Sequence, residues 1–206
     1  MCFCNVIKRL FAFFLCIVLF ISCNTTKNLT KEARYPVYVT NRSKVYPLPA
    51  LNIEKDLDCI QSFKGEFGKN SFMALLYLTG DKNGFDITIL NDLGITMGTL
   101  TYTDKELCLS SPLFPEELKA QYIIMDLQNV YYSFASLKKL YNSAGLDFTE
   151  SIQKDGSIKR FITKKSIKKK DINDLSNIIE EINIKSNVIT INNYYRNYKY
   201  VLSLMQ

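Results

Sequence analysis

The chain has 206 residues, with 26 basic against 20 acidic side chains and a formal charge of +6 at neutral pH. This excess is small and spread along the chain, so it does not indicate a nucleic-acid partner, and we expect none. The sequence holds 13 Tyr and 13 Phe but neither His nor Trp. A chain without histidine lacks the usual general base near neutral pH and the usual zinc ligand. We therefore expect no catalytic residue, no cofactor and no metal site.

Sequence motifs of enzymes are missing as well. The chain has no G-x-S-x-G elbow, no paired-carboxylate motif and no glycine-rich phosphate loop. A hydrolase acting on lipid or glycan is the enzyme class that we considered, and nothing in the sequence supports it. We predict a protein that is not an enzyme.

The N-terminal segment has the order of a secretory signal. Lys8-Arg9 precede an uncharged apolar run over residues 10–21, which ends in Phe20-Ile21-Ser22-Cys23. A positive flank, an apolar run of about a dozen residues and a small residue before the cleavage point indicate a signal peptide rather than a spanning helix. The last four residues resemble a bacterial lipobox, in which the cysteine is diacylated on sulfur and becomes the new N-terminus. An ordinary signal peptide with an incidental cysteine is the alternative.

The lipobox predicts a lipid anchor at Cys23 and removal of residues 1–22. The formal charge then falls from +6 to +4, because Lys8 and Arg9 leave. Two or three acyl chains such as palmitate on Cys23 would anchor the protein firmly, since a single chain binds only marginally. Asn24 is not the aspartate that retains lipoproteins at the inner membrane of enteric bacteria. We therefore predict a location at the cell outer membrane, facing the periplasm.

The mature chain is expected to contain a tether and one domain. Residues 23–34 are polar and without periodicity, which is typical of a flexible tether. Residues 35–206 are predicted to form the single domain. It begins with two proline-punctuated extended segments, 35–39 and 46–49, which we expect to lie along the body instead of forming central strands.

Two cysteines, Cys59 and Cys108, remain in the predicted domain, and both lie in strand-like segments. An oxidising periplasm permits a disulfide between them. Two buried free thiols are an equally good interpretation, because sequence alone does not show whether two cysteines meet.

The first half of the domain has the pattern of an antiparallel meander. Five short strands are separated by turns rich in Gly, Asn and Asp, of which residues 80–84 are a plain hairpin signal. The segment 71–79 is apolar at both alternating sets of positions, so we expect it to be covered on both faces. The expected strands are 60–67, 71–79, 85–89, 95–102 and 107–109.

Two helices are expected next. Pro115-Glu116-Glu117 is a helix start, because proline suits the first turn and acids complement the helix dipole. Apolar residues at helical spacing extend this helix over roughly 115–130. Ser133 is typical of the cap of a second helix, which Gly145 closes. Asp126 has an unusual apolar setting within the first helix, for which we expect capping or pairing with a lysine.

Strands return after the helices, joined by a hairpin signal at residues 154–157. The segment 178–184 fits a helix or a strand, but the turn signal at Ser186-Asn187 favours a strand, which places Glu180 on the same face as Ile182. Lysines concentrate over residues 164–170. We interpret them as a solvated hairpin edge that discourages edge-to-edge pairing, with contact to anionic lipid head groups as the alternative. The expected strands are 146–153, 158–164, 178–184, 188–191 and 198–204.

Three stretches carry a family resemblance. Leu93-Gly94-Ile95 to Gly98-Thr99-Leu100-Thr101-Tyr102-Thr103-Asp104 resembles a strand and turn of the form G-x-x-L-x-Y-D-G. Ser111-Pro112-Leu113-Phe114-Pro115 with residues 120–128 is similar to the loop and first helix of the same family. The segment 191–200 is similar to its closing hairpin, L-x-N-x-x-x-G-Y-x-L. These stretches resemble the LolA/LolB superfamily, and within it a family of uncharacterised bacterial lipoproteins, some encoded beside fatty-acid and aryl-polyene biosynthesis genes.

The likeness covers most of residues 55–206 and departs from the family pattern in lacking a glycine after Asp104 and before Tyr198. It implies an α+β fold in which a curved antiparallel sheet forms an incomplete (half) β-barrel, with two helices against its concave face. It also implies a protein without an active site that handles lipid or acyl groups.

The resulting function hypothesis is a monomeric outer-membrane lipoprotein that binds or carries a lipid, an acyl chain or a lipoprotein in the cell envelope. Leu113 and Phe114, between two prolines, form an apolar tip that would touch a bilayer or, alternatively, staple the helix. Apolar residues of the sheet and the helices would line the ligand cavity, unless the helices fill it completely. The expected lining is Phe72, Leu76, Ile87, Ile89, Met97, Leu100, Tyr102, Tyr122, Met125, Phe134 and Leu137.

The alternative function is that of a structural or accessory envelope lipoprotein, which binds a protein partner through a sheet edge or through exposed tyrosines such as Tyr194 and Tyr195. Tyrosine-rich surfaces favour recognition. The abundance of Lys, Asn, Ile and Tyr in an AT-rich genome would explain the same composition without any binding role.

Overall fold

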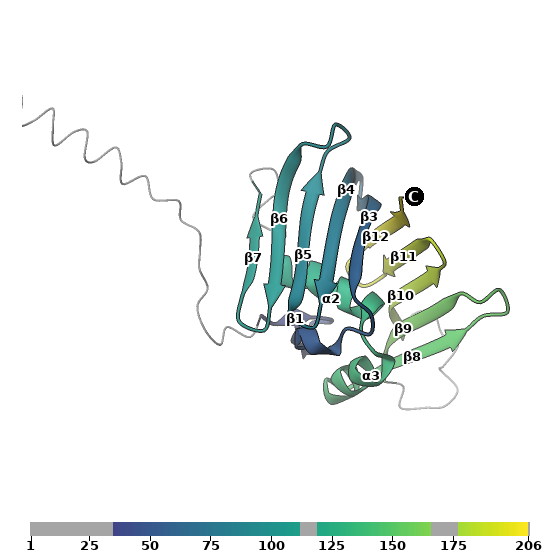
Figure 1. The fold of residues 1–206 in the computed structure, drawn as a ribbon. Coiled ribbons are helices and arrows are strands. Elements are labelled where there is room, and N and C mark those ends of the chain that lie inside the picture. The colour runs from purple at the N-terminus through teal and green to yellow at the C-terminus, as the bar shows by residue number, and fades with distance from the viewer. Residues whose placement is uncertain (1–34, 112–118, 166–176, 206) are drawn as a thin grey trace, which may run out of the picture.

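A computed structural model describes residues 35–111, 119–165 and 177–205 (Figure 1). The predicted signal peptide, Cys23, the tether, the Leu113-Phe114 tip and most of the lysine cluster lie outside these residues. No helix within the described part of the chain is long and apolar enough to span a membrane.

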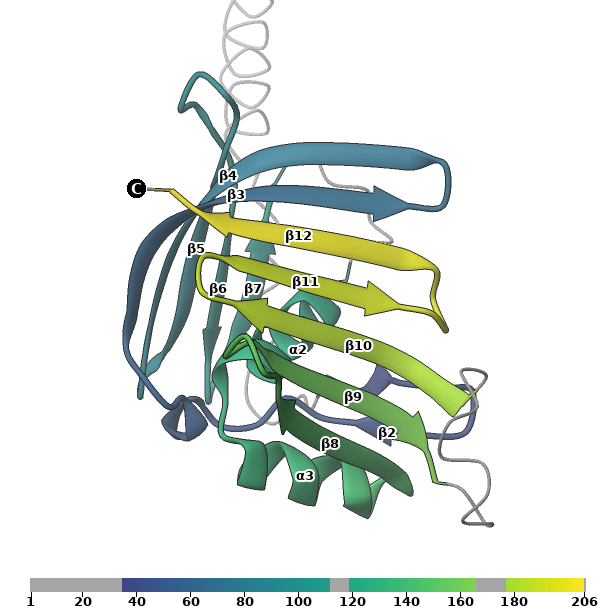
Figure 2. The ribbon, with the colours of Figure 1, turned by 90° about the vertical axis from the view of Figure 1, so that its right-hand side faces the viewer.

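The chain is an α+β protein built on one curved, antiparallel ten-stranded sheet (Figure 1). The strand order is β7-β6-β5-β4-β3-β12-β11-β10-β9-β8, so that β7 and β8 are edges and the sheet is an incomplete barrel. Figure 2 shows the curvature from the side, with α2 inside the bend. The strands are β3 (Leu57–Phe67), β4 (Asn70–Asp81), β5 (Gly84–Leu90), β6 (Thr96–Thr103), β7 (Leu107–Ser110), β8 (Leu146–Ile152), β9 (Ile158–Lys164), β10 (Ile178–Lys185), β11 (Val188–Asn193) and β12 (Tyr198–Leu204).

The expected strands of both halves are confirmed, including the strand at 178–184, which is β10 and pairs with β9 and β11. Each hairpin is short, and neighbours in sequence are mostly neighbours in the sheet. The exception joins β3 to β12, the closing strand, which brings the two ends of the domain together.

The first expected helix begins later than predicted. Lys119 has extended backbone angles, φ −91° and ψ 118°, and α2 runs over Ala120–Tyr131. The extended Lys119 separates the proline–acid start signal at residue 115 from this helix. The second helix, α3 (Phe134–Ser143), has the predicted cap: the Ser133 hydroxyl accepts from the Ser136 amide at 3.3 Å.

The proline-punctuated N-terminal segment forms a strap outside the main sheet, as expected. β1 (Val37–Tyr38) and β2 (Lys44–Val45) pair only with each other, and the short helix η1 (Ala50–Asn52) follows. Val37, Val39 and Val45 are buried in the same apolar cluster as α2. The strap therefore covers part of the concavity.

The expectation that segment 71–79 is covered on both faces is wrong. The inner face of β4 is covered, but Met73 and Tyr77 on the outer face are 71% and 41% exposed. The convex side of the sheet has no described layer over it, because both helices and the strap lie on the inner side (Figure 2).

Cys59 and Cys108 are free thiols, and both are half-buried. Cys59 lies on β3 and Cys108 on β7, with β4, β5 and β6 between them. Four strand spacings of about 4.8 Å separate them by roughly 19 Å. That separation is far beyond the reach of a disulfide.

Candidate functional site

The concave face consists of the inward positions of all ten strands, with α2 across it. α2 contacts β7 and β10, so it spans the bend from one side to the other. Its Ile124, Met125 and Leu127 belong to one apolar cluster, whereas Val130 belongs to a second cluster over β10, β11 and β12. The helix thus divides the inner face into two apolar regions.

All of the predicted lining residues lie in the first apolar region, and Leu76 also belongs to the second. Six of them are buried and serve as solid core: Ile87, Ile89, Leu100, Tyr102, Met125 and Leu137. The other five are only partly buried: Phe72, Leu76, Met97, Tyr122 and Phe134. Met97 lies in a β-bulge between β5 and β6. The helices therefore fill part of the concavity and leave part of its lining accessible.

The second region is rich in aromatic rings that the lining prediction omitted. Phe63 and Phe67 of β3 contact Tyr200 of β12 with ring centroids 5.2 Å and 5.5 Å apart. The ring of Tyr198 stacks on the ring of Tyr200, with centroids 4.7 Å apart. Phe63, Phe67 and Tyr198 are partly buried. The sequence shows aromatic residues at alternating positions of β3 and of β12, which could have indicated this cluster. It does not show that the two strands are neighbours, because they pair across more than 130 residues of sequence.

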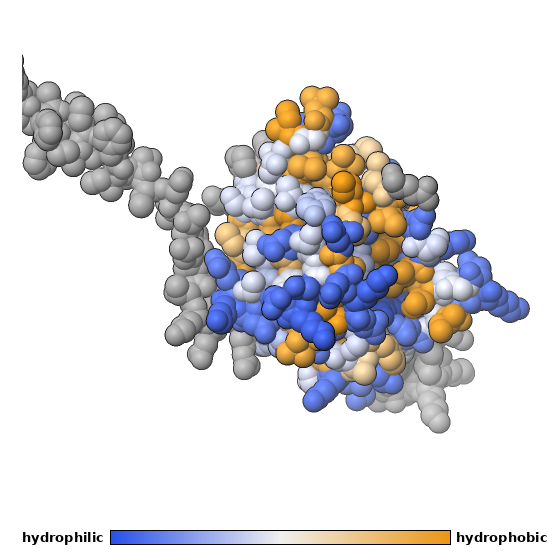
Figure 3. Space-filling model, in the orientation of Figure 1, coloured by the Kyte–Doolittle hydropathy of each residue, from blue (hydrophilic) through white to orange (hydrophobic). Residues whose placement is uncertain are grey.

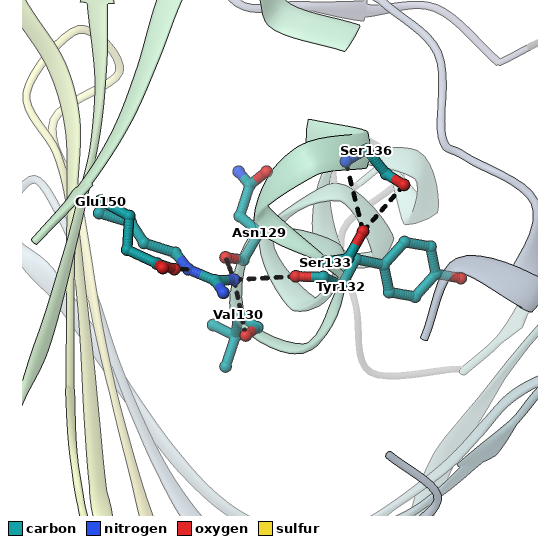
Figure 4. Close-up of polar contacts among 7 residues, drawn as sticks. Asn129, Val130, Tyr132, Ser133, Ser136 and Glu150 are labelled. Carbon is teal, nitrogen blue, oxygen red and sulfur yellow. Dashed lines mark hydrogen bonds and ion pairs between the residues drawn. The ribbon is translucent and has the colours of Figure 1, made fainter. Parts of the chain in front are cut away.

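A buried arginine fixes the end of α2 (Figure 4). Arg160 of β9 donates from Nη1 to the carbonyl oxygens of Asn129, Val130 and Tyr132 at 2.8, 3.0 and 3.1 Å. Its Nε forms an ion pair with Glu150 of β8 at 2.7 Å. The last carbonyls of a helix have no partner within the helix, and a cation complements the negative end of its dipole. Arg160 therefore caps α2 from the sheet.

Two buried carboxyl groups, those of Asp126 and Glu180, interact electrostatically in the second region. The Tyr198 hydroxyl lies 2.9 Å from both oxygens of Asp126. Glu180 accepts from Asn129 at 2.9 Å and from Asn193 at 2.7 Å. The expected lysine partner of Asp126 is wrong: its partner is a tyrosine. The helix turns Asp126 inward toward β12.

Burial, with the mutual repulsion of the two acids, raises the pKa of Asp126 well above its ordinary value. Burial also raises the pKa of Glu180, which the two amide donors and Arg196 oppose by stabilising the ionised form. Since Asp126 has one hydroxyl neighbour and Glu180 has two amide donors that stabilise its ionised form, the pKa of Asp126 is the more strongly raised of the two.

Polar side chains hold the strap against α2. Tyr38 donates its amide to the Tyr122 hydroxyl at 3.3 Å. The Tyr38 carbonyl oxygen accepts a hydrogen bond from the guanidinium of Arg196. The Cζ atom of this guanidinium lies 3.8 Å from the centroid of the Tyr122 ring. Further along, Gln128 exchanges two hydrogen bonds with the backbone of Leu48, at 2.8 and 2.9 Å. The segment that leads to the predicted anchor is thereby connected to the helix inside the half-barrel.

The tyrosines named for partner binding are exposed but engaged within the chain. The Tyr194 hydroxyl donates to Glu181 at 2.8 Å, and the Tyr195 hydroxyl accepts from the Asn41 amide at 3.0 Å. Two apolar side chains at the tip between β5 and β6 are more exposed than these tyrosines: Leu93 is 78% exposed and Ile95 is 60% exposed. Figure 3 shows the hydrophobic surface at this tip.

The polar residues of the inner face were mostly missed from sequence. Gln61, Arg160 and Glu180 are each less than a tenth exposed. The only signal in the sequence is the alternation of each strand: these polar residues occupy the same alternating positions as apolar residues that face inward. Within the described residues, no group of three or more His, Cys, Asp or Glu is arranged to hold a metal ion.

The fold and the site together define an α+β half-barrel whose concave face is apolar, divided by a helix and crossed by a few buried polar groups. Residues 59–206 match the model of a family described as a protein of unknown function, DUF3261, and the chain belongs to that family. Comparison with curated proteins gave no match.

Proposed function

We propose that this protein is a lipid-anchored protein of the cell envelope that binds an acyl chain or a similar amphiphile in its half-barrel, without catalysing a reaction. The observation that carries the proposal is the partly exposed apolar lining of the concave face. It includes Phe72 in the first apolar region, Phe63, Phe67 and Ile184 in the second, and Leu76 in both.

Apolar side chains that a protein keeps inside a concavity without covering them favour an apolar ligand. Each square ångström of apolar surface removed from water contributes about 25 cal/mol, so a long acyl chain gains several kcal/mol on such a surface. Ligand sites of this kind are apolar with a few polar groups. The buried polar groups of the inner face fit that description.

The N-terminal sequence supports the envelope location. The lipobox-like residues 20–23 would place the acylated Cys23 at the membrane, and the polar residues up to 34 would connect it to the strap. The resemblance to the LolA/LolB superfamily is a second line of support for lipid handling. Leu93 and Ile95 at the β5–β6 tip would add an apolar contact with the bilayer.

A non-enzymatic accessory lipoprotein that binds a protein partner is the second candidate. The same exposed tip favours it, because contiguous exposed apolar residues mark protein or membrane contacts. Binding of the tip to lipid vesicles of defined composition would favour the membrane, and its absence would favour a protein partner.

Native mass spectrometry of residues 24–206, purified gently from cells, tests the proposal. This chain retains every described element of the sheet and both helices. We expect a stoichiometric adduct with the mass of an acyl ligand, which denaturation removes. A bare protein mass, repeated after incubation with envelope lipids, would reject the carrier function.

Two neighbouring leucines of β4 provide a matched pair of variants. Leu76 faces the concavity opposite Gln61, and Leu75 faces outward opposite Ser62. Leu76→Ser should lose the adduct, whereas Leu75→Ser should retain it, with circular dichroism showing that both remain folded. Equal loss in both variants would place the ligand elsewhere.

A further inference from the structure

Gln61 is a buried amide in the middle of the apolar inner face. It lies on β3, and its side chain is 5% exposed. Its Nε2 donates to the hydroxyl of Tyr131 at the end of α2, at 2.9 Å. Its Oε1 has no hydrogen-bond partner among the residues that the structure describes. Buried polar atoms are nearly always paired, so an unpaired one requires an explanation.

Rotating the amide does not remove the unpaired atom. In the orientation described above, Gln61 Oε1 lacks a donor, and the Tyr131 hydroxyl, which accepts from Nε2, still has its own proton to donate. No acceptor for that proton is found in the described part of the chain. In the opposite orientation Tyr131 donates to the amide oxygen, and the amide NH₂ is left unpaired. In either case the pair of side chains retains unused hydrogen-bonding capacity.

The surroundings of this pair are apolar and incompletely covered. Leu76 and Leu204 are the cross-strand neighbours of Gln61 on β4 and β12. Leu204 is 40% exposed, and Leu76 and Tyr131 are partly buried members of both apolar clusters. Gln61 therefore lies where the two apolar regions meet, beside surface that remains partly open.

No charged side chain among the described residues is bonded to Gln61 or Tyr131. Burial raises the pKa of the Tyr131 hydroxyl to about 12, so this group remains a neutral donor at physiological pH. A carboxylate or phosphate placed here would be desolvated without a cation to pair with. The site selects against charged head groups.

We propose that Gln61 and Tyr131 bind the uncharged polar group of an acyl ligand, one that both donates and accepts a hydrogen bond, such as a hydroxyl or an amide. The acyl chain would lie on the partly exposed apolar residues around them, Phe63, Leu76 and Leu204. This inference rests on the proposed binding of an acyl ligand and specifies its head group. It fits a monoacylglycerol or an N-acyl amide, and it disfavours a free fatty acid.

The test compares three palmitoyl ligands that share one chain and differ in the head group. Residues 24–206 are titrated with monopalmitoylglycerol, with palmitate and with methyl palmitate, and occupancy is followed by native mass spectrometry. We expect monopalmitoylglycerol to bind about tenfold more tightly than the methyl ester, which only accepts a hydrogen bond. Gln61→Leu and Tyr131→Phe should each reduce this preference to about twofold or less and leave methyl palmitate binding unchanged.

Asn183 provides the matched control. Its Oδ1 is also buried and unpaired, but its β10 position alternates with the inward Ile182 and Ile184, so it belongs to the outer face. Asn183→Leu should leave the head-group preference unchanged. Because Gln61→Leu also removes the hydrogen bond to Tyr131, thermal unfolding is measured for both leucine variants. A cooperative transition above the temperature of the binding assay in each of them shows that a binding loss in Gln61→Leu is not attributable to unfolding.

The outcomes separate this inference from the proposed function. Retention of the preference in Gln61→Leu and Tyr131→Phe would overturn the role of the pair, as would equal binding of all three ligands, while both results leave acyl binding intact. Tighter binding of palmitate than of monopalmitoylglycerol would also overturn it. If none of the three ligands binds the wild-type chain, the proposed function fails as well.

Discussion

Arg160 of β9 and Glu150 of β8 form a 2.7 Å ion pair on the inner face of the sheet, and the same guanidinium caps the carboxyl end of α2. Arg160 is 4% exposed, so its charge depends on these partners. One side chain thus connects two strands and the helix that divides the concavity. The position of α2, and with it the shape of both apolar regions, depends on this contact.

Replacing Arg160 should therefore destabilise the whole domain. Arg160→Met would leave three helix carbonyls and Glu150 without their donor, and breaking a buried pair in this way costs about 3–5 kcal/mol. Urea unfolding followed by circular dichroism measures the loss. Lys64→Met, which removes an exposed ion pair with Glu66, is the control and should change the free energy of unfolding far less, because solvent screens an exposed pair. Equal effects of the two substitutions would contradict the capping role.

The acid pair predicts a pH-dependent stability. Asp126 faces Glu180, Tyr198, Tyr200 and Arg196, and burial raises the pKa of both acids above the unfolded values. A group with a raised pKa in the folded state contributes stability that is complete below its unfolded pKa, near pH 4, and is lost as the pH rises through the folded pKa. The free energy of unfolding attributable to the pair should thus fall from pH 5 to pH 8.

Asp126→Asn tests this directly, because asparagine has the shape of the protonated acid. Each unit of raised pKa corresponds to about 1.4 kcal/mol, and the variant should lose that part of the pH dependence. Urea unfolding at pH 5, 6, 7 and 8 should give a flatter profile for Asp126→Asn than for the wild type. Parallel profiles would show that Asp126 is ionised throughout this range.

Substitutions at the tip between β5 and β6 are expected to weaken membrane binding without changing the stability of the fold. Leu93→Ser with Ile95→Ser should reduce binding of residues 24–206 to lipid vesicles several-fold, and exposed substitutions change stability by only about 0.5 kcal/mol. Vesicle co-sedimentation measures binding. Ile152→Ser is the control, since Ile152 is 76% exposed at the end of β8. Unchanged binding in the double variant would remove the tip from the membrane contact.

Gly84 is required where β5 meets β6. A Cβ at this position would lie 2.0 Å from the carbonyl oxygen of Tyr102, which is backbone and moves only with the strand. Gly84→Ala should therefore be strongly destabilising in thermal unfolding. Gly68→Ala meets no atom within 4 Å and should cost only the strain of its positive φ, about 1–2 kcal/mol. A loss of stability in Gly84→Ala no greater than the loss in Gly68→Ala would contradict the close approach of β5 and β6 at Gly84.

Much of this fold was predictable because its elements are local. Alternation along 85–89 and 198–204 identifies strands, and the Ser133 cap with Gly145 delimits α3 within a residue or two. These signals depend on neighbours in sequence. The exposed outer face of β4 was not predictable, because an apolar strand reads the same whether or not a second layer covers it.

The site divides in the same way. The inward positions of Ile87 and Tyr122 follow from the alternation of their strand and the helical spacing of α2, so the sequence alone determined that apolar residues at these positions would face inward. Tertiary structure decided which polar groups would join them. The Gln61 amide meets Tyr131 across 70 residues of sequence, and Asn129 reaches Glu180 across 51. Pairing over such distances depends on strand register and on the helix position, which no local pattern encodes, so only the folded chain brings these groups together.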